Sequence, residues 1–279
     1  MSRSRTTLPG EIIFEGTGIH SGRASSVKIS PHNEGQGITF AFGTRQYCIT
    51  EAQADGSMRS TSLLFPGGER VGTVEHLLSA IAGLGLDDVL ITVCGDEIPI
   101  MDGSPLPFAE AINTRGLREF DSEYVVCSLS VPVCVNLKKS QIIALPSDEL
   151  KITYVIDYPD SPIGTEMMDI VVTPENFMSQ IAPARTFCLA KEAEAIRASG
   201  FGLGGGEDNV LIIRDKDPAG GRYRVNRECA AHKAADLLGD IMLAGFTAFA
   251  HYICVRGGHA LHIKLADRIK RIILKNSGR

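Results

Sequence analysis

The sequence lacks the features of nucleic-acid-binding and membrane-spanning proteins. Lys and Arg number 28 against 33 Asp and Glu, so the formal net charge of -5 provides no basic field for a nucleic-acid backbone. No stretch of the chain approaches the roughly 18 apolar residues that a membrane span needs. The first ten residues, MSRSRTTLPG, also lack the apolar core of an export signal. We therefore expect a cytoplasmic protein that binds no nucleic acid and does not insert into membranes.

The sequence also has no paired cysteines of the CxxC type. Its seven cysteines are scattered, and several lie inside apolar runs that resemble strands. This usage indicates buried, reduced thiols in a cytoplasm and excludes both a disulfide framework and a cysteine-rich zinc knot.

The length of 279 residues fits one large α/β unit or two ordinary domains, and the chain pattern favours two. Short runs broken by glycine, such as EIIFEG, ASSVKISP and GITFAFG, predict strands in the first half. A helix capped by Thr73 and ended by Gly83 interrupts them, and FAEAINTRG predicts a second helix. We predict a first α+β domain over residues 1–122.

After the polar segment DSEYV, alternating runs resume in VVCSLSVPVCVNL, QIIALPS and LKITYVIDY, as if the same plan had restarted. Helices are predicted in PENFMSQIA, in LAKEAEAIRASG and in RECAAHKAADLLGDIMLAG. Asn226 is the expected cap of this last helix, and Gly245 its end. The second α+β domain is therefore predicted over residues 123–279.

Two short segments together carry ligands for a divalent metal. His232 and Asp236 are four positions apart in the long helix, so their side chains project from one face. His76 can complete a His/His/Asp set that leaves a tetrahedral zinc ion one open position for water. Glu75 is then placed to act as a general base on that water.

Each of these residues also has an ordinary interpretation. A His-x-x-x-Asp pair is common on helix surfaces, and Glu75 could simply favour the positive helix N-terminus. The pair lies, however, in an alanine-rich helix where an unpaired His and Asp would be costly to bury. The combination therefore favours a hydrolytic metal site.

A third histidine, His259, follows a strand-like run in a GGH turn, where a mobile general acid could lie. Asp240, one turn beyond Asp236, could orient His259 and raise its pKa. An ordinary turn residue is the alternative. The glycine-rich GLGGGED at 202–208 lacks the Gly-Lys-Ser/Thr ending of a phosphate loop, so we interpret it as a flexible wall of a substrate channel.

Several multi-residue motifs together resemble one known family. GTGIHSG, GTVEHLLSAIAGLGLDDV, EIPIMDGSPLPF, ARTF, HKAADLLGD and GGHAL occur in the order and approximate spacing of the bacterial zinc-dependent UDP-3-O-acyl-N-acetylglucosamine deacetylases. The similarity runs from about Leu8 to Ile269. Members of this family catalyse the committed step of lipid A synthesis. The resemblance implies two similar α+β domains, each a mixed sheet with helices, packed so that the helices lie between the sheets.

The resemblance also implies residue roles. Zn²⁺ would be held by His76, His232 and Asp236, with Glu75 as general base, Thr186 as an oxyanion stabiliser and His259 with Asp240 as the general-acid pair. The substrate, a UDP-3-O-acyl-N-acetylglucosamine, would contact residues along the site and a hydrophobic passage for its acyl chain, namely Lys233, Phe187, His20, Arg256, Leu189, Ala193, Ile196 and Leu203. Transient proximity to a membrane and a monomeric state are expected with it.

Three positions depart from the family pattern. Cys188 replaces the usual glycine after ARTF, His262 stands where asparagine is common, and Ser60 replaces a cysteine that some relatives place near the metal. The first two leave open a related metal-dependent amidase that acts on a different N-acyl sugar nucleotide. A non-catalytic binding paralogue is the other alternative, against which the complete set of catalytic residues argues.

Overall fold

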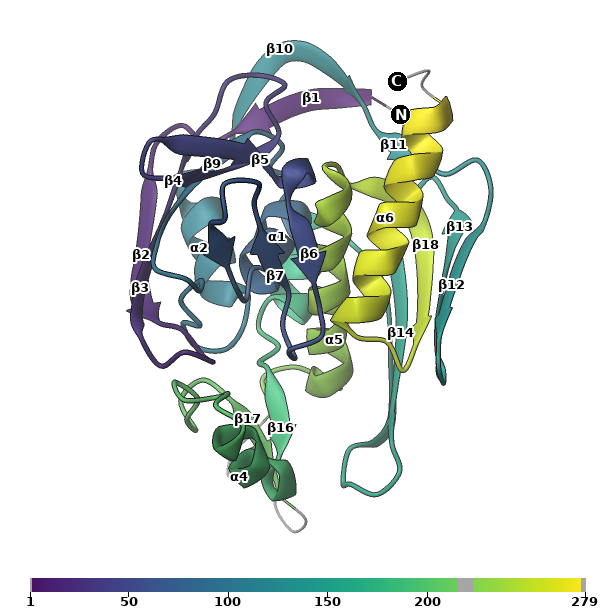
Figure 1. Cartoon of the computed structure of the whole chain (residues 1–279). Helices are drawn as coiled ribbons and strands as arrows, with labels where there is room; N and C mark the ends of the chain where they lie inside the picture. The colour runs from purple at the N-terminus through teal and green to yellow at the C-terminus, as the bar shows by residue number, and fades with distance from the viewer. Residues whose placement is uncertain (1, 215–222, 277–279) are drawn as a thin grey trace.

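The computed structural model describes residues 2–214 and 223–276, which form an α+β fold with two main sheets and helices between them (Figure 1). Within this part of the chain, no helix is long and apolar enough to cross a membrane. The two sheets stand on opposite sides of the molecule, and α1, α2, α5 and α6 fill the space between them.

The first sheet has the strand order β2-β3-β9-β4-β5. β2 (Ile12–Thr17) and β3 (Ala24–Pro31) form one antiparallel pair, and β4 (Ile38–Phe42) and β5 (Arg45–Cys48) form another. The last strand, β9 (Val89–Cys94), lies between them, antiparallel to β3 and parallel to β4.

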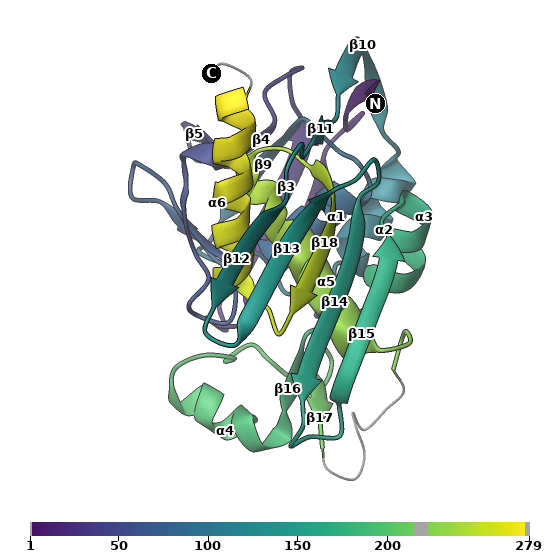
Figure 2. The same cartoon turned by 90° about the vertical axis from the view of Figure 1, so that its right-hand side faces the viewer.

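The second sheet repeats this topology in the order β12-β13-β18-β14-β15, seen face-on in Figure 2. β12 (Val133–Leu137) pairs with β13 (Ser140–Pro146), and β14 (Lys151–Tyr158) with β15 (Gly164–Val171). The last strand, β18 (Ala248–Val255), again enters antiparallel to one neighbour and parallel to the other, and the short β11 (Cys127–Ser128) pairs with it. The restart predicted from the sequence is thus a repeat of the same sheet.

The helices also repeat. In the first half α1 (Glu75–Gly83) precedes β9 and α2 (Leu106–Arg115) follows it; in the second half α5 (Glu228–Ile241) precedes β18 and α6 (His259–Asn276) follows it. The two equivalent helices α1 and α5 pack against each other at the centre. Gly239 permits this, because a Cβ at this position would overlap the backbone carbonyl oxygen of Glu75. This close approach brings the predicted metal ligands of both halves together.

Smaller elements surround this framework. β1 (Ser2–Thr7) pairs with β10 (Arg118–Val125), a strand that spans the predicted domain boundary after residue 122. β6 (Gln53–Asp55), β7 (Ser62–Leu64) and β8 (Arg70–Val71) form a small sheet. In the second half, β16 (Phe187–Leu189), α4 (Ala190–Ala198) and β17 (Leu211–Ile213) form an insert in which the two strands pair in parallel. The short α3 (Pro174–Asn176) continues as a π-helix over Phe177–Ile181, and 3-10 turns cover Ile49–Glu51 and Met242–Ala244.

Three local predictions were wrong. Thr73 does not cap α1: its backbone is left-handed with φ 56°, and its hydroxyl donates to Glu97, while Val74 holds the cap position. Asn226 does not cap α5, because Arg227 occupies that position. All seven cysteines are free thiols as expected, but only Cys229 and Cys254 are buried.

Candidate active site

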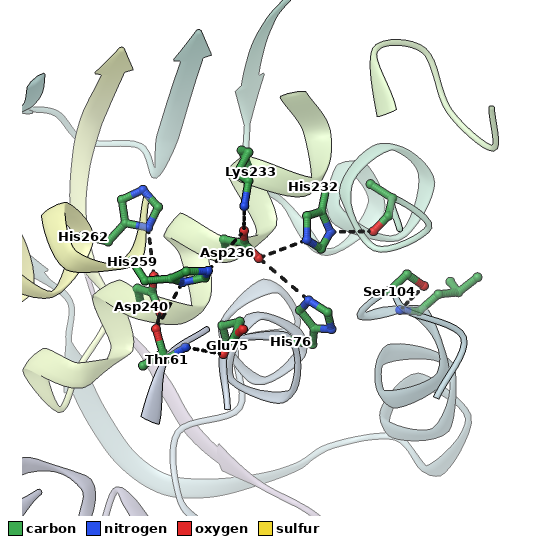
Figure 3. A network of polar contacts seen from close by, with 12 residues as sticks. Thr61, Glu75, His76, Ser104, His232, Lys233, Asp236, Asp240, His259 and His262 are labelled. Carbon is green, nitrogen blue, oxygen red and sulfur yellow. Dashed lines mark hydrogen bonds and ion pairs between the residues drawn. The ribbon is translucent and has the colours of Figure 1, made fainter. Parts of the chain in front are cut away.

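A cavity of about 470 Å³ lies between the two halves, and residues of α1, α5 and the start of α6 line it. The first turn of α1 contributes Glu75 and His76 from one side, and the face of α5 contributes His232 and Asp236 from the other (Figure 3). All four side chains are buried. Residues 156 positions or more apart in sequence therefore share one buried polar site.

His76, His232 and Asp236 converge on a single point. One ligand atom from each lies within 4.8 Å of the others. The Nε2 atoms of His76 and His232 lie 3.8 and 3.4 Å from the same carboxylate oxygen, Asp236 Oδ1. This spacing leaves room for one ion between three ligand atoms.

The protonation states and hydrogen bonds of these three side chains suit the binding of a cation. Burial lowers the pKa of His76 to about 3 and also lowers the pKa of His232, so both rings are neutral and carry a free lone pair. His232 Nδ1 lies 3.1 Å from the carbonyl oxygen of Ala184, and an N–H donated there leaves Nε2 to face the site. Asp236 Oδ1, although buried, has no hydrogen-bond partner within the described residues. Such an unsatisfied buried oxygen fits a metal ligand.

The other Asp236 oxygen is already paired. Lys233 Nζ donates to Oδ2 at 2.7 Å, and Lys233 Nζ also lies 5.6 Å from the centre of the Phe187 ring. Burial would raise the pKa of Asp236, but the neighbouring cationic and imidazole groups lower it well below its usual range. Asp236 therefore stays ionised in the interior.

Glu75 is the buried carboxyl group beside His76, His232 and Asp236, which together form the candidate metal triad. Its Oε2 accepts the backbone N–H of Thr61 at 3.0 Å. Burial, reinforced by the charges of Asp240 and Asp236, raises the pKa of Glu75 to about 8 despite the opposing effect of His259. A carboxylate with such a pKa can take up and return a proton near neutral pH.

His259 and Asp240 lie in direct contact on the opposite wall of the site. His259 Nδ1 is 2.9 Å from Asp240 Oδ2, and its Nε2 is 3.8 Å from Asp236 Oδ2. Burial alone would lower the pKa of His259, but Asp240 and Asp236 outweigh this effect and raise it to about 9. The ring is therefore protonated at neutral pH, with Nε2–H directed at Asp236 of the candidate metal triad.

The predicted oxyanion residue Thr186 and four of the predicted substrate residues are distributed along the same cavity. Thr186, Phe187, His20, Lys233 and Arg256 all line it. Arg256 is paired with Asp157 at 2.6 Å, and the ring of His20 meets Phe201 edge-on with 5.4 Å between ring centres.

The predicted acyl passage is brought together only in part. Ala193, Ile196 and the departure residue Cys188 line the cavity, as do Gly202, Gly205 and Gly206 of the glycine-rich segment. Leu189 is buried outside the cavity lining, and Leu203 is 57% exposed on the surface. The backbone N–H groups of Leu203 and Gly204 donate to the carbonyl oxygens of His20 and Ile19, which joins the glycine-rich segment to the loop that carries His20.

Sequence reasoning missed the residues that connect the site to its surroundings. Besides the backbone contact to Glu75, the Thr61 hydroxyl donates to Asp240 Oδ1 at 2.5 Å. Tyr154 on β14 is hydrogen-bonded to His262. Glu97 accepts the backbone N–H groups of His20 and Ser21, holding that loop at the cavity edge. Of these residues, Glu97 lies in the motif EIPIMDGSPLPF, and His262 is one of the departures from the family pattern.

A neutral His/His pair, an ionised Asp, a buried carboxyl base and a protonated imidazole in one cavity are the components of a hydrolase site with a place for a divalent metal. Comparison with known proteins agrees with this class. The model of the LpxC family, described as UDP-3-O-acyl N-acetylglycosamine deacetylase, matches residues 5–271. The chain therefore belongs to this family. It is accordingly a deacetylase, a hydrolase that acts on an amide bond.

Curated relatives support the assignment over almost the full length. The UDP-3-O-acyl-N-acetylglucosamine deacetylase of Chlamydia trachomatis serovar D is 35% identical over 274 residues, 96% of each chain. The proteins of the same name from Chlamydia caviae and Leptospira biflexa are 34% and 32% identical. Each alignment covers 98% of this chain, with 99% and 91% of the respective relative.

Proposed function

We propose that this chain removes the N-acetyl group of UDP-3-O-(3-hydroxyacyl)-N-acetylglucosamine in lipid A synthesis, releasing acetate, with Zn²⁺ held by His76, His232 and Asp236. The observation that carries the proposal is the buried Asp236 Oδ1, which has no hydrogen-bond partner in the described chain and faces two neutral imidazoles. Two nitrogens and one carboxylate oxygen are a common catalytic zinc set.

The metal would supply Lewis acidity, which polarises an amide carbonyl and lowers the pKa of water. Glu75, one residue from a ligand, would accept the proton of the attacking water. Protonated His259 and the Thr186 hydroxyl would stabilise the negative charge that develops on the carbonyl oxygen. The leaving sugar nitrogen then receives a proton from His259 or from Glu75.

The remaining residues would hold the substrate. Lys233 fixes Asp236 and stands over the Phe187 ring, which offers a flat surface for a sugar. Arg256 supplies a cation at the cavity edge for a diphosphate. Ala193 and Ile196 of α4 offer apolar surface for the start of an acyl chain.

Mass spectrometry of the products tests the substrate. Zinc-loaded protein is incubated with UDP-3-O-acyl-N-acetylglucosamine and, separately, with UDP-N-acetylglucosamine that lacks the acyl chain. We expect loss of one acetyl group from the acylated substrate, and much slower loss from the other. Deacetylation of a different N-acyl sugar nucleotide, with the acylated substrate untouched, would favour the related amidase. No product from any substrate, with the protein folded and zinc-bound, would favour the binding paralogue.

We also propose that the protein works as a monomer in the cytoplasm. The seven free thiols support the compartment, because cytoplasmic proteins keep cysteines reduced. Light scattering of the purified protein tests the monomer, and a dimer mass would exclude it.

A further inference from the structure

Asp240 accepts hydrogen bonds from two histidines at once. His262 Nδ1 lies 2.8 Å from Asp240 Oδ2, the same oxygen that receives His259 Nδ1 at 2.9 Å. His259 and His262 are three residues apart at the start of α6, so both rings project towards this carboxylate (Figure 3). Asp240 and His262 are completely buried. The proposed general-acid pair is therefore part of a larger buried network.

The contacts of His262 determine which of its nitrogens carries the proton. The interacting histidines lower the pKa of Asp240 against the effect of burial, so this carboxylate is ionised and can only accept. His262 must then donate from Nδ1. Burial lowers the pKa of His262, so the ring is neutral and Nε2 is an acceptor. The hydroxyl of Tyr154, 2.9 Å away, donates to that nitrogen.

The backbone before His259 leaves space for this pair. A Cβ on Gly257 would overlap Cys254 Sγ, and it would lie 2.7 Å from the Tyr154 hydroxyl oxygen and 3.1 Å from His262 Nε2. Gly257 of the GGH motif thus allows the turn that carries His259 to pack directly against the Tyr154–His262 pair. His262 itself does not line the cavity, so it acts on the site through the Asp240 carboxylate that it contacts.

We propose that His262, held as a neutral Nδ1–H donor by the Tyr154 hydroxyl, is a positioning residue that fixes the carboxylate of Asp240 and, through it, the orientation of His259. This inference rests on the proposed function of His259 in deacetylation. The anchored carboxylate has little freedom to rotate, since Thr61 holds its other oxygen. Partners of this kind that orient a reactive imidazole typically change activity by about 10–100-fold when removed.

Three variants of the zinc-loaded enzyme test the role. His262→Leu removes the donor at similar volume, and we expect kcat to fall about tenfold with KM and zinc content changed less than about twofold. His262→Asn places an amide N–H where Nδ1 stood, and we expect it to keep kcat within about threefold of wild type. Tyr154→Phe removes the hydroxyl that donates to His262 Nε2, so the ring is no longer held in one tautomer. We expect a loss of kcat between those of the other two variants. This variant tests the role even if His262→Leu does not fold.

A double-mutant cycle separates positioning from general stabilisation. In a His259→Gln background, His262→Leu is expected to cause no further loss of kcat, because the residue through which it acts is gone. The same tenfold loss in both backgrounds would overturn the proposal, as would a His262→Asn enzyme as slow as His262→Leu.

A spectroscopic readout distinguishes this proposal from the proposed function. Nitrogen-15 NMR of the histidine rings in the zinc-loaded wild type is expected to show His262 protonated on Nδ1 alone. An Nε2–H tautomer would refute the proposal whatever the enzyme does. A wild-type protein that releases no acetate, but shows the expected tautomer, would instead refute the proposed deacetylation.

Discussion

Gly239→Ala is expected to disturb the active site from the interface between α1 and α5. The added methyl would overlap the carbonyl oxygen of Glu75 and lie 2.9 Å from its carbonyl carbon. Both atoms belong to the backbone of α1, so no side-chain rotation can relieve the contact. The helices must separate, which moves His232 and Asp236 away from Glu75 and His76.

The magnitude follows from two opposing effects. Overpacking a well-packed contact lowers stability by about 1–3 kcal/mol. We expect the upper end, about 3 kcal/mol, because the neighbouring atoms belong to a rigid backbone. Alanine in place of glycine inside a helix returns about 1 kcal/mol. We therefore expect the free energy of unfolding to fall by about 2 kcal/mol, measured by urea denaturation of the metal-free protein. Because a displacement of about 1 Å can reduce rates roughly 100-fold, kcat/KM should fall by at least tenfold. A rise in stability, as helix propensity alone predicts, would refute the close packing.

Three further predictions concern ligands, protons and anchoring. His76→Ala should abolish zinc retention, while His259→Ala should keep zinc and lower kcat about 100-fold or more; metal analysis after gel filtration decides, and a zinc-free His259→Ala protein would contradict the assignment. Asp240→Asn removes the charge that raises the pKa of His259, so the alkaline limb of the pH–rate profile should move to lower pH, and an unmoved limb would argue against His259 as the acid. Arg185→Met leaves the buried carboxylate of Glu228 without its 2.8 Å partner, so thermal or urea unfolding should show a loss of about 3 kcal/mol, and an unchanged stability would be inconsistent with this pair.

The residues of the candidate metal site could be picked out from sequence because part of their arrangement is local. His232 and Asp236 lie four residues apart in one helix, so helix periodicity alone places both on one face. Glu75 and His76 are adjacent at the start of another helix, so sequence places them close together without orienting them. The repeat of the two halves was also visible as a restart of alternating strands. Its strand order was not, because β9 and β18 enter between earlier hairpins through long-range pairing.

What sequence could not provide were contacts made by the backbone or by distant single residues. The carbonyl oxygen of Ala184 orients His232, and the backbone N–H of Thr61 holds Glu75; any residue type carries such groups. The cap at Thr73 was wrong because tertiary contact with Glu97 outweighed the local capping preference. Leu203 was expected in the acyl passage, but its backbone pairs with His20 and leaves the side chain outside.

The most direct test of the account is the rate of acetate release from UDP-3-O-acyl-N-acetylglucosamine by wild type and by Glu75→Gln, both carrying one zinc ion per chain. Glutamine keeps the shape of the side chain but cannot accept the proton of water. We expect steady release by wild type and a rate that is lower by a factor of about 100 or more for the variant. Equal rates at equal zinc content would contradict Glu75 as the base, and no release by zinc-loaded wild type would contradict the proposed deacetylation itself.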